Sequence, residues 1–436
     1  MSDVTRRVTL PRRIGDRKAL LRVVVDPREN ASEAAVPSSK RLPATIQVLV
    51  GAGFLVAIGY GIVAPALPLF AGSLGVGVTG ASIVVSAFAI FRLVFAPAGG
   101  ALLDRFGALW VFAGGLIVVG LSSGACAFAE DFAQLVVLRS LGGIGSTMFT
   151  VSAAALILRA APVTMRGRAA GAWATGFLVG SAAGPAVGGW LVDVNPRAPF
   201  VLYAAVLIAV AVGAVVALRK RIGPSFVRAA PDEPAPRFAA PWRDPTFRAA
   251  LTSNFLNGWT AYGVRLALAP LFVVDELGWS GIWAGAALTA FAVGTAATSS
   301  VGGWCADRYG RRPPVLVGLV VVGVTMCWLG FSTSPPELMV VALASGCGTG
   351  LTNPASSAAV NDVVADGGGG TRAGSSLAAY QMVGDLGAIV GPIVAGMVVK
   401  WCGYPLAFSL TAAIVVISFA LWCNAPETVV NRRRRG

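Results

Sequence analysis

The sequence predicts an all-α membrane protein of 12 transmembrane helices, arranged as two pseudo-symmetric six-helix bundles. Of its 436 residues, 56% are hydrophobic and only 12% are charged, whereas a water-soluble domain has roughly 45–50% apolar and about 25% charged residues. The apolar residues come in long uncharged runs without strand-like alternation, which excludes a water-soluble fold and a membrane β-barrel. Since a helix needs about 20 apolar residues to cross a bilayer, the length accommodates about twelve spans.

The apolar segments fall into two groups of six on either side of a charged, proline-rich segment. The first six spans are expected at 44–70, 79–102, 109–128, 134–158, 169–192 and 199–218. The second six are expected at 249–274, 281–304, 314–332, 337–359, 374–399 and 404–423. The domains are therefore a basic tail (1–43), a first bundle (44–218), a linker (219–248), a second bundle (249–424) and a second basic tail (425–436).

The positively charged residues alternate between the two ends of these spans. The tails and the loops after even-numbered spans hold 29 of the 34 Lys and Arg residues, whereas the loops after odd-numbered spans hold two. Because positively charged loops stay on the cytoplasmic side, both termini of this multi-pass protein are expected in the cytoplasm, below a plasma membrane. The net charge of +14 has the same origin, so no nucleic-acid partner is expected.

Cysteine and histidine usage predicts neither a metal site nor a cofactor. The six cysteines lie singly in or beside apolar runs, and the chain has no CxxC motif and no histidine. These cysteines are expected to be small packing residues within helices.

Two motifs recur in the two halves at nearly the same offset. The segment Gly100-Ala-Leu-Leu-Asp-Arg-Phe-Gly107 follows the second span, and Gly303-Trp-Cys-Ala-Asp-Arg-Tyr-Gly310 follows the eighth, 203 residues later. The pattern Gly180-x3-Gly-Pro185 in span five recurs as Gly387-x3-Gly-Pro392 in span eleven, 207 residues later. Two correspondences at nearly one offset indicate duplicated halves, which many transporters have.

These motifs resemble those of the major facilitator superfamily over nearly the whole chain, from about residue 44 to about 424. The family's loop signature GxxxDRxGRR is complete in the second copy, whereas Ala108 and Leu109 replace its two basic residues in the first. In such a loop, glycine permits a tight turn, and the aspartate caps a helix while pairing with arginine. The residues of these two gating loops are Gly100, Asp104, Arg105, Gly107, Gly303, Asp307, Arg308, Gly310, Arg311 and Arg312. Plain positive-inside anchoring is the alternative reading of these charges.

The fifth span is similar to the pattern that marks the antiporter branch of this family, particularly twelve-helix drug:proton antiporters. Small residues let two helices approach closely and proline bends the axis, so generic tight packing is the alternative. The residues of this antiporter-like helix are Gly180, Gly184, Pro185, Gly188 and Gly189. In span eleven, the pattern Tyr380-x4-Asp385-x5-Gly391-Pro392 is similar to the same region of vesicular monoamine transporters.

Ionisable residues within spans are costly and therefore functional candidates. Arg92 lies 12 residues before Asp104, about 18 Å into span two, and Asp385 lies 11 residues after Gly374, about 16 Å into span eleven. In the resembled fold these two spans are neighbours, so we expect an Arg92–Asp385 pair that forms or breaks during transport; a static pair is the alternative. Asp385 is the one carboxylate in the middle of a predicted span and hence the candidate proton carrier.

Further polar residues in the spans are candidates for coupling or binding. Arg139 looks like the family's embedded span-four arginine and is assigned to proton coupling, with snorkelling as the alternative. The residues expected to line a substrate cavity are Arg265, Asn257, Asn254, Tyr60, Tyr380 and Gln381. Bonding within the bundle is the alternative for this group. Three embedded arginines against one aspartate predict a positive interior, which favours neutral amphiphiles or organic anions over lipophilic cations.

The predicted function is efflux of a small amphiphilic compound or drug by proton antiport through alternating access, carried out by a monomer. A uniporter or importer is the rival within transport, and the absence of an acidic residue from span one favours it. A membrane-embedded enzyme would need a nucleophile or metal cluster that the spans do not offer, and a non-transporting sensor would use the basic tail. Detection of substrate flux separates transport from both.

Overall fold

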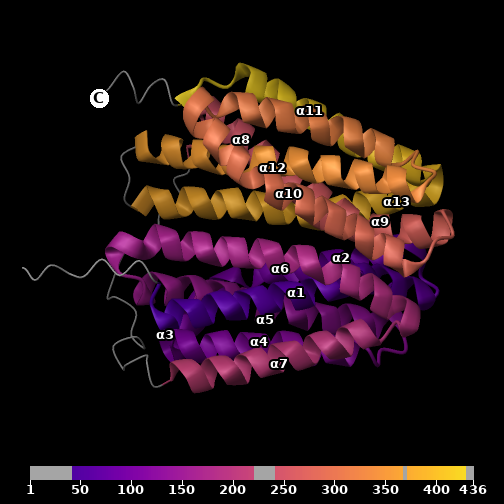
Figure 1. Ribbon diagram of the computed structural model, residues 1–436, viewed down its shortest axis with the longest axis horizontal. Helices are drawn as coiled ribbons and strands as arrows, with labels where there is room; N and C mark the ends of the chain where they lie inside the picture. Colours follow the sequence, from indigo (N-terminus) through magenta and orange to yellow (C-terminus); the bar gives the residue numbers. More distant parts are fainter. Residues whose placement is uncertain (1–41, 220–240, 367–370, 429–436) are drawn as a thin grey trace, which may run out of the picture. The chain divides into compact units, whose positions relative to one another are not determined.

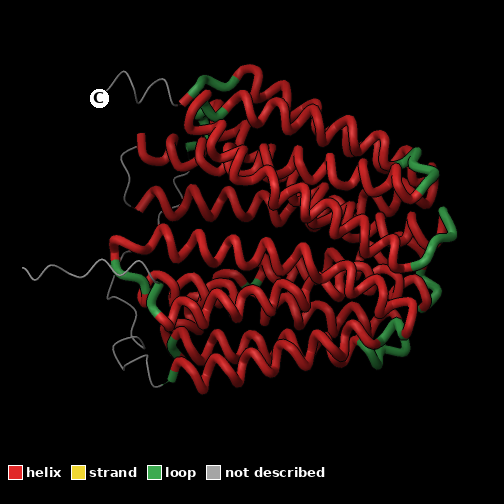
Figure 2. Tube along the Cα trace, in the orientation of Figure 1, coloured by secondary structure: helices red, strands yellow, loops and turns green. Residues whose placement is uncertain are grey.

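A computed structural model describes residues 42–219, 241–366 and 371–428 of the protein (Figure 1). Helices connected by short loops make up these residues, and no strand occurs among them (Figure 2). Much of the predicted N-terminal tail, linker and C-terminal tail lies outside the described residues. Two π-helical segments and one 3-10 turn interrupt the α-helices.

The first bundle contains seven α-helices that form six spans. They are α1 (Ala44–Ser73), α2 (Gly77–Val94), α3 (Ala96–Phe106), α4 (Ala108–Cys126), α5 (Phe132–Ala160), α6 (Arg166–Val194) and α7 (Ala198–Leu218), with a 3-10 turn (Val163–Met165) before α6. The predicted second span is thus divided between α2 and α3 at Phe95. Pro97 explains the break, because proline donates no backbone hydrogen bond and its ring clashes with the carbonyl four residues earlier.

The second bundle contains the remaining helices. They are α8 (Pro245–Asn257), a first π segment (Gly258–Val264), α9 (Arg265–Leu271), a second π segment (Phe272–Glu276), α10 (Gly281–Tyr309), α11 (Arg312–Leu329), α12 (Pro335–Asp366) and α13 (Thr371–Asn424). Span seven consists of four short pieces, from α8 to the second π segment. Gly403, with φ 82° and ψ 171°, divides α13 into spans eleven and twelve.

Nine helices among the described residues are by themselves long and apolar enough to cross a membrane. The other three spans are absent from this count for local reasons. Span seven is fragmented, α13 contains two spans, and α12 is interrupted by Gly, Ser, Thr and Asn residues that lower its mean hydropathy. The twelve-span fold predicted from the sequence is therefore confirmed.

The duplication predicted from the motifs is visible in the helix packing. A Cβ added to Gly143 of α5 would lie 2.4 Å from the Phe88 carbonyl oxygen of α2. A Cβ added to Gly346 of α12 would lie 2.0 Å from the Phe291 carbonyl oxygen of α10. Both members of the second contact are 203 residues after their counterparts, so spans two and four cross as spans eight and ten do.

Two helix pairs form most of the interface between the bundles. The glycine seam is the contact of α6 with α10 around Gly189 and Gly285, and the ion-pair seam is the contact of α2 with α13 around Ser82 and Asp385. Helices α1 and α9 meet between the two seams. We refer below to the Asp307 end of the molecule, where α10 ends, and the Asp193 end, where α6 ends; they lie at the left and right of Figure 1 respectively.

Candidate functional site

An ion pair joins the two bundles at the predicted depth. The guanidinium Nη2 of Arg92 donates a hydrogen bond to Oδ1 of Asp385, with the side chains 40% and 19% exposed. Arg92 lies in the last turn of α2, and its carbonyl accepts a 2.8 Å hydrogen bond from the Thr147 hydroxyl of α5. The contact expected from matching depth and from the resembled fold is therefore present, and both groups remain partly accessible to water.

Two of the predicted cavity residues remain accessible near this pair, together with one residue that the sequence did not single out. Tyr60 of α1 is half-buried and Gln381 of α13 is exposed. Tyr262, in the first π segment, has 57% of its surface exposed.

The other two embedded arginines point into the bundles instead. Arg139 is 4% exposed, and its guanidinium carbon lies 4.2 Å from the centroid of the Phe88 ring in the first bundle. Arg265 is 3% exposed and lies 3.7 Å from the Phe291 centroid, with a 2.6 Å hydrogen bond to Ser345 Oγ in the second bundle. Arg265 was expected to line the cavity, but its side chain contacts Phe291, Ser345 and Met326, which all belong to the second bundle.

The remaining predicted cavity residues bond within the second bundle, as the alternative interpretation proposed. Asn254 is 9% exposed and donates a 2.6 Å hydrogen bond to the Tyr380 carbonyl. Tyr380 is 8% exposed, and its hydroxyl donates a 3.5 Å hydrogen bond to Ser356. The Asn257 side chain accepts a 3.2 Å hydrogen bond from the Asn353 amide. Asn257 differs from the other two residues in being only half-buried.

The complete copy of the loop signature is a connected charge cluster at the Asp307 end. Arg311 donates hydrogen bonds to Asp307 and, at 2.9 Å, to Asp362 at the end of α12. Burial disfavours the charge of Arg311, but the hydrogen bonds to these two carboxylates outweigh it and raise the pKa of the guanidinium. Gly310 ends α10 at φ 106°, a left-handed conformation that favours glycine.

The sequence motif did not reveal a third carboxylate that holds this loop. Glu427, which follows span twelve, accepts hydrogen bonds of 2.7 and 3.1 Å from the backbone amides of Arg311 and Arg312. It thereby caps the N-terminus of α11, where a negative charge is stabilising. Arg312 in turn donates a 2.6 Å hydrogen bond to the Cys423 carbonyl. Arg308 differs, because it stacks over Trp304 at 5.5 Å.

The incomplete copy of the signature keeps the turn without this cluster. Gly107 ends α3 with φ 80°, as Gly310 ends α10. Asp104 and Arg105 are exposed, and Arg105 lies 5.5 Å from the centroid of the neighbouring Phe106 ring. A Cβ added to Gly100 would meet nothing within 4 Å, and one added to Gly303 would reach only Pro354 at 4.0 Å. These two glycines are therefore not required by close packing.

The antiporter-like glycines lie on two faces of α6. Cβ atoms added to Gly180, Gly184 and Gly188 would lie 2.5, 2.3 and 2.1 Å from three carbonyl oxygens of α1 that are four residues apart. Pro185 follows the same path, since its ring would meet a Cβ added to Gly61 at 2.8 Å. Gly189 faces the other bundle, with an added Cβ 2.4 Å from the Gly281 carbonyl of α10. The motif thus packs one helix of its own bundle and one helix of the other.

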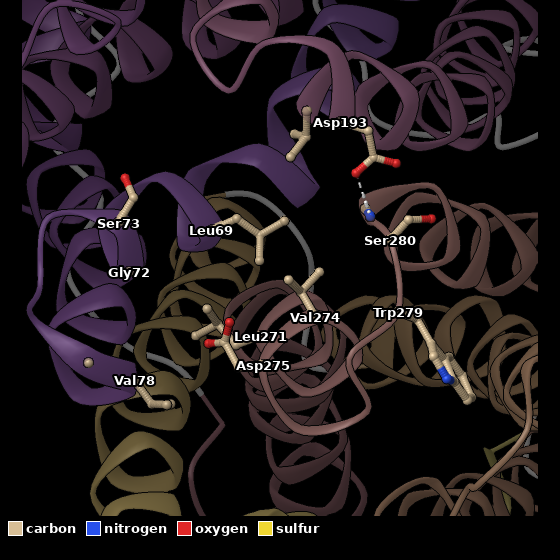
Figure 3. Close-up of a pocket in the computed structure, with 13 residues that line it drawn as sticks. Leu69, Gly72, Ser73, Val78, Asp193, Leu271, Val274, Asp275, Trp279 and Ser280 are labelled. Atoms are coloured by element: carbon tan, nitrogen blue, oxygen red, sulfur yellow. Dashed lines mark hydrogen bonds between the residues drawn. The ribbon is translucent and has the colours of Figure 1, made fainter.

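A cavity of about 430 Å³ lies at the Asp193 end, between helices of both bundles (Figure 3). The Asp193 carboxylate accepts hydrogen bonds of 2.7 and 3.1 Å from the amides of Gly281 and Ile282, so it caps α10 across the interface. Asp275 also lines the cavity. Among the described residues, no three His, Cys, Asp or Glu side chains cluster as a metal site.

Comparison with known proteins gives a consistent family assignment. The sequence profile of the Major Facilitator Superfamily matches residues 49–264 and 250–436. Multidrug resistance protein 1 of Bacillus subtilis (strain 168) is 24% identical over 389 residues, which are 88% of this chain and 97% of that protein. Quinolone resistance protein NorA of Staphylococcus aureus (strain MRSA252) is 30% identical over 147 residues, which are 34% of this chain and only 38% of that protein.

The fold is also similar to that of solved transporters. A bacterial homolog of the human lysosomal transporter Spinster, in an inward-facing and unoccupied conformation, superimposes with a TM-score of 0.72 at 16% identity. The match covers 87% of this chain and 95% of the other. The occupied form of that protein gives a TM-score of 0.70. Because the family profile matches almost all of its spans and the fold agrees with this match, the chain belongs to the Major Facilitator Superfamily of membrane transporters.

Proposed function

We propose that this transporter exports small amphiphilic compounds in exchange for protons, with Asp385 as the proton carrier and Arg92 as its partner. The observation that carries the proposal is the ion pair, which joins α2 to α13 across the bundle interface. Movement of one bundle relative to the other during alternating access must break or rearrange this contact. Protonation of Asp385 neutralises the carboxylate and so weakens the contact.

The chemistry of the pair supports this coupling. A guanidinium beside a carboxylate favours the ionised acid, whereas a carboxyl separated from its partner and surrounded by apolar groups favours the protonated acid. The paired state of Asp385 therefore releases a proton, and the separated state takes one up. Because both side chains are partly exposed, water can deliver that proton.

Arg139 is assigned to proton coupling together with Arg92 and Asp385, because it contacts α2, the helix that carries Arg92. The Phe88 ring on which its guanidinium lies is one helical turn before Arg92. Its Nε has no hydrogen-bond partner among the described residues, and it interacts electrostatically with Cys126 and Tyr203.

The cargo is assigned to small amphiphilic drugs, and the positions of the arginines remove an argument against cations. The names of the two bacterial relatives refer to quinolone and multidrug resistance. Arg139 and Arg265 are 4% and 3% exposed within separate bundles, so the positive interior expected from the sequence is not a positive cavity. At the interface, Arg92 and Asp385 sum to no net charge.

Orientation and assembly follow from the same reasoning. The positive-inside rule assigns the Asp307 end to the cytoplasm of a cell with this protein in its plasma membrane. Both termini then lie in the cytoplasm. The loop cluster of Arg311, Asp307 and Asp362 acts as a gate at that end, and a monomer carries the complete site.

The test is proton movement in energised inside-out vesicles, followed with a pH-sensitive dye while cationic, neutral and anionic compounds are added. Wild type and Asp385→Asn are compared at equal expression, with Asp275→Asn as a carboxylate control at the end of span seven. We expect a compound to dissipate the pH gradient with wild type and Asp275→Asn but not with Asp385→Asn. The assignment is refuted if Asp385→Asn retains both the substrate flux and the proton dependence of wild type. Substrate flux without any proton signal would instead indicate uniport.

A further inference from the structure

A buried arginine in the second bundle has no acidic partner. Arg265 is 3% exposed, yet it forms no ion pair with any residue in the described part of the chain. A charged group within a membrane-spanning bundle usually pairs with an opposite charge, and a buried charge left without its partner is strongly destabilising. The proposed proton coupling gives this arginine no role. Its charge therefore requires a partner from elsewhere.

Groups from three other helices hold the guanidinium of Arg265. Its central carbon lies 3.7 Å from the centroid of the Phe291 ring of α10, which is a cation–π contact. Its Nη2 donates a 2.6 Å hydrogen bond to Ser345 Oγ of α12 and lies 3.9 Å from Met326 Sδ of α11. Ser345 and Met326 are 1% and 0% exposed. All of these groups are neutral, so they orient the guanidinium without balancing its charge.

The close crossing of α10 and α12 brings the phenylalanine and the serine together. A Cβ added to Gly346, which follows Ser345, would lie 2.0 Å from the Phe291 carbonyl. The first bundle has the equivalent crossing, where Arg139 lies over Phe88, the counterpart of Phe291 203 residues earlier. The residue there that is equivalent to the serine is a glycine. A hydroxyl beside the buried arginine is therefore specific to the second bundle.

Two adjacent hydrogen-bond donors have no acceptor among the residues that the structure describes. Nη1 of Arg265 is buried and has no hydrogen-bond partner there. Ser345 accepts its bond from Arg265, so its own O–H proton remains to be donated, and no described group accepts it. By contrast, the nearby hydroxyls of Thr325 and Thr349 donate to backbone carbonyls at 2.7 and 3.1 Å. Because buried donors are nearly always paired, Arg265 and Ser345 require an acceptor, and the arginine requires one with negative charge.

We propose that Arg265 and Ser345 bind a small monovalent inorganic anion, such as chloride, inside the second bundle. The anion accepts hydrogen bonds from Nη1 of the arginine and from the serine hydroxyl. One negative charge balances one guanidinium, whereas a divalent anion would leave the site negative. The burial of Met326 and Ser345, at 0% and 1% exposure, favours a single-atom anion over an organic acid. The site is built from the second bundle alone and is independent of the proposed exchange of cargo for protons.

The test is thermal unfolding of the purified full-length protein in lipid nanodiscs, followed by tryptophan fluorescence during a chloride titration. Sodium gluconate replaces sodium chloride, so that the ionic strength stays constant. A ligand that binds only the folded state raises the midpoint of unfolding in a concentration-dependent manner. We expect the wild-type midpoint to be higher by at least about 2 °C in roughly 0.2 M chloride than in gluconate.

Two substitutions at the site should change this response, and a third should not. Arg265→Gln keeps an amide donor but removes the charge, so it should abolish the chloride-dependent rise in the midpoint. Ser345→Ala removes the second donor and should raise the half-saturating chloride concentration by at least about tenfold, which is the loss of one hydrogen bond to a charged group. Thr325→Val is the matched control, because this buried hydroxyl of the same bundle already has a backbone acceptor. It should keep the wild-type response.

Each of four results would overturn the anion site. They are equal wild-type midpoints in chloride and gluconate, a full chloride response in Arg265→Gln, a Ser345→Ala titration that matches wild type, and a response that Thr325→Val also loses. In the first case, the Phe291 ring and neutral groups alone compensate the guanidinium. If Arg265→Gln fails to fold, the comparison of Ser345→Ala with Thr325→Val decides: a shifted titration in the serine variant alone supports the site, and equal titrations refute it.

Discussion

The glycine seam and the ion-pair seam are related by the internal repeat, yet different forces hold them. In the glycine seam, a Cβ added to Gly189 would lie 2.4 Å from the Gly281 carbonyl, and one added to Gly285 would lie 2.2 Å from the Pro185 carbonyl. Backbone lies directly against backbone at this crossing. Asp193 then caps α10 from the opposite bundle. Within the part of the chain that the structure describes, the carboxylate contact of this crossing is that of Asp193, at its end of α6.

The counterpart of each of these residues in the ion-pair seam is different. Gly396 is the counterpart of Gly189, and it faces Ser82, where α10 has Gly285. Hydroxyl groups bridge the helices, with Ser86 donating to the Ile389 carbonyl at 2.8 Å. Lys400 stands at the position equivalent to Asp193, 207 residues later, so no carboxylate caps α2 from the other bundle there.

The difference teaches that, of the two seams, the ion-pair seam carries a titratable pair at mid-depth where the glycine seam has uncharged residues. The ion-pair seam contains Arg92 and Asp385, whereas the equivalent positions of the glycine seam are Thr295 and Leu178. Loss or gain of a proton at mid-depth therefore changes the attraction between α2 and α13 and leaves the α6–α10 crossing unchanged. Under the proposed coupling, one seam responds and the other serves as a pivot.

The largest effect is expected from breaking the pivot with Gly285→Val. Its Cβ would lie 2.2 Å from a backbone carbonyl, and backbone cannot move aside as a flexible side chain does. We expect the two helices to separate and substrate flux in vesicles to fall by at least about tenfold, more than 1.4 kcal/mol in the barrier. Gly213→Val is the control, because an added Cβ there meets nothing within 4 Å. Equal flux in both variants would mean that the crossing does not need glycine.

A smaller effect is expected when the ion-pair seam is given the residues of the glycine seam. Asp385→Leu alone leaves Arg92 unpaired, and because the arginine is 40% exposed we expect a loss of only about 1–3 kcal/mol in the free energy of unfolding. Arg92→Thr combined with Asp385→Leu copies Thr295 and Leu178 and is expected to recover most of that loss. Thermal unfolding in detergent measures both variants. A double variant less stable than Asp385→Leu would contradict this account.

The smallest effect is expected at the cap that only the glycine seam has. Asp193→Ala removes the acceptor for the Gly281 and Ile282 amides and should cost about 1 kcal/mol. Asp193→Asn keeps an oxygen acceptor and should cost less, whereas Asp193→Lys, which copies Lys400, places a cation at a helix N-terminus and should cost more. The measurement is the free energy of unfolding of the three variants. If the loss in the free energy of unfolding does not increase in the order Asp193→Asn, Asp193→Ala, Asp193→Lys, then the cap does not distinguish the two seams.

The sequence was sufficient for features that depend on depth or on a repeated motif. Twelve spans and two bundles followed from apolar length, charge and the repeated motifs, and the contact of Arg92 with Asp385 followed from matching depth together with the resembled fold, in which their spans are neighbours. The break between α2 and α3 could also have been anticipated from Pro97, although we expected one continuous span. These features are set by the chain's own local chemistry.

Features that depend on which neighbouring helix a side chain meets could not be predicted. Arg265 was expected in the cavity, but a helical position gives only an angle, and Phe291 and Ser345 occupy that angle inside the bundle. Tyr262 was missed because its exposure within the first π segment depends on how the helices pack, which the sequence pattern does not give. The register between packed helices cannot be read from the amino-acid sequence alone.

The cap on α11 has a consequence for the timing of assembly during synthesis. Arg311 and its acceptor Glu427 are 116 residues apart in the chain. At about 5–20 residues per second, the ribosome needs roughly 6 to 23 seconds to make the intervening segment. Throughout that interval the first amides of α11 lack their carboxylate, and the membrane-insertion machinery holds an unfinished bundle. The arrival of Glu427 completes the cluster only after all twelve spans have been made.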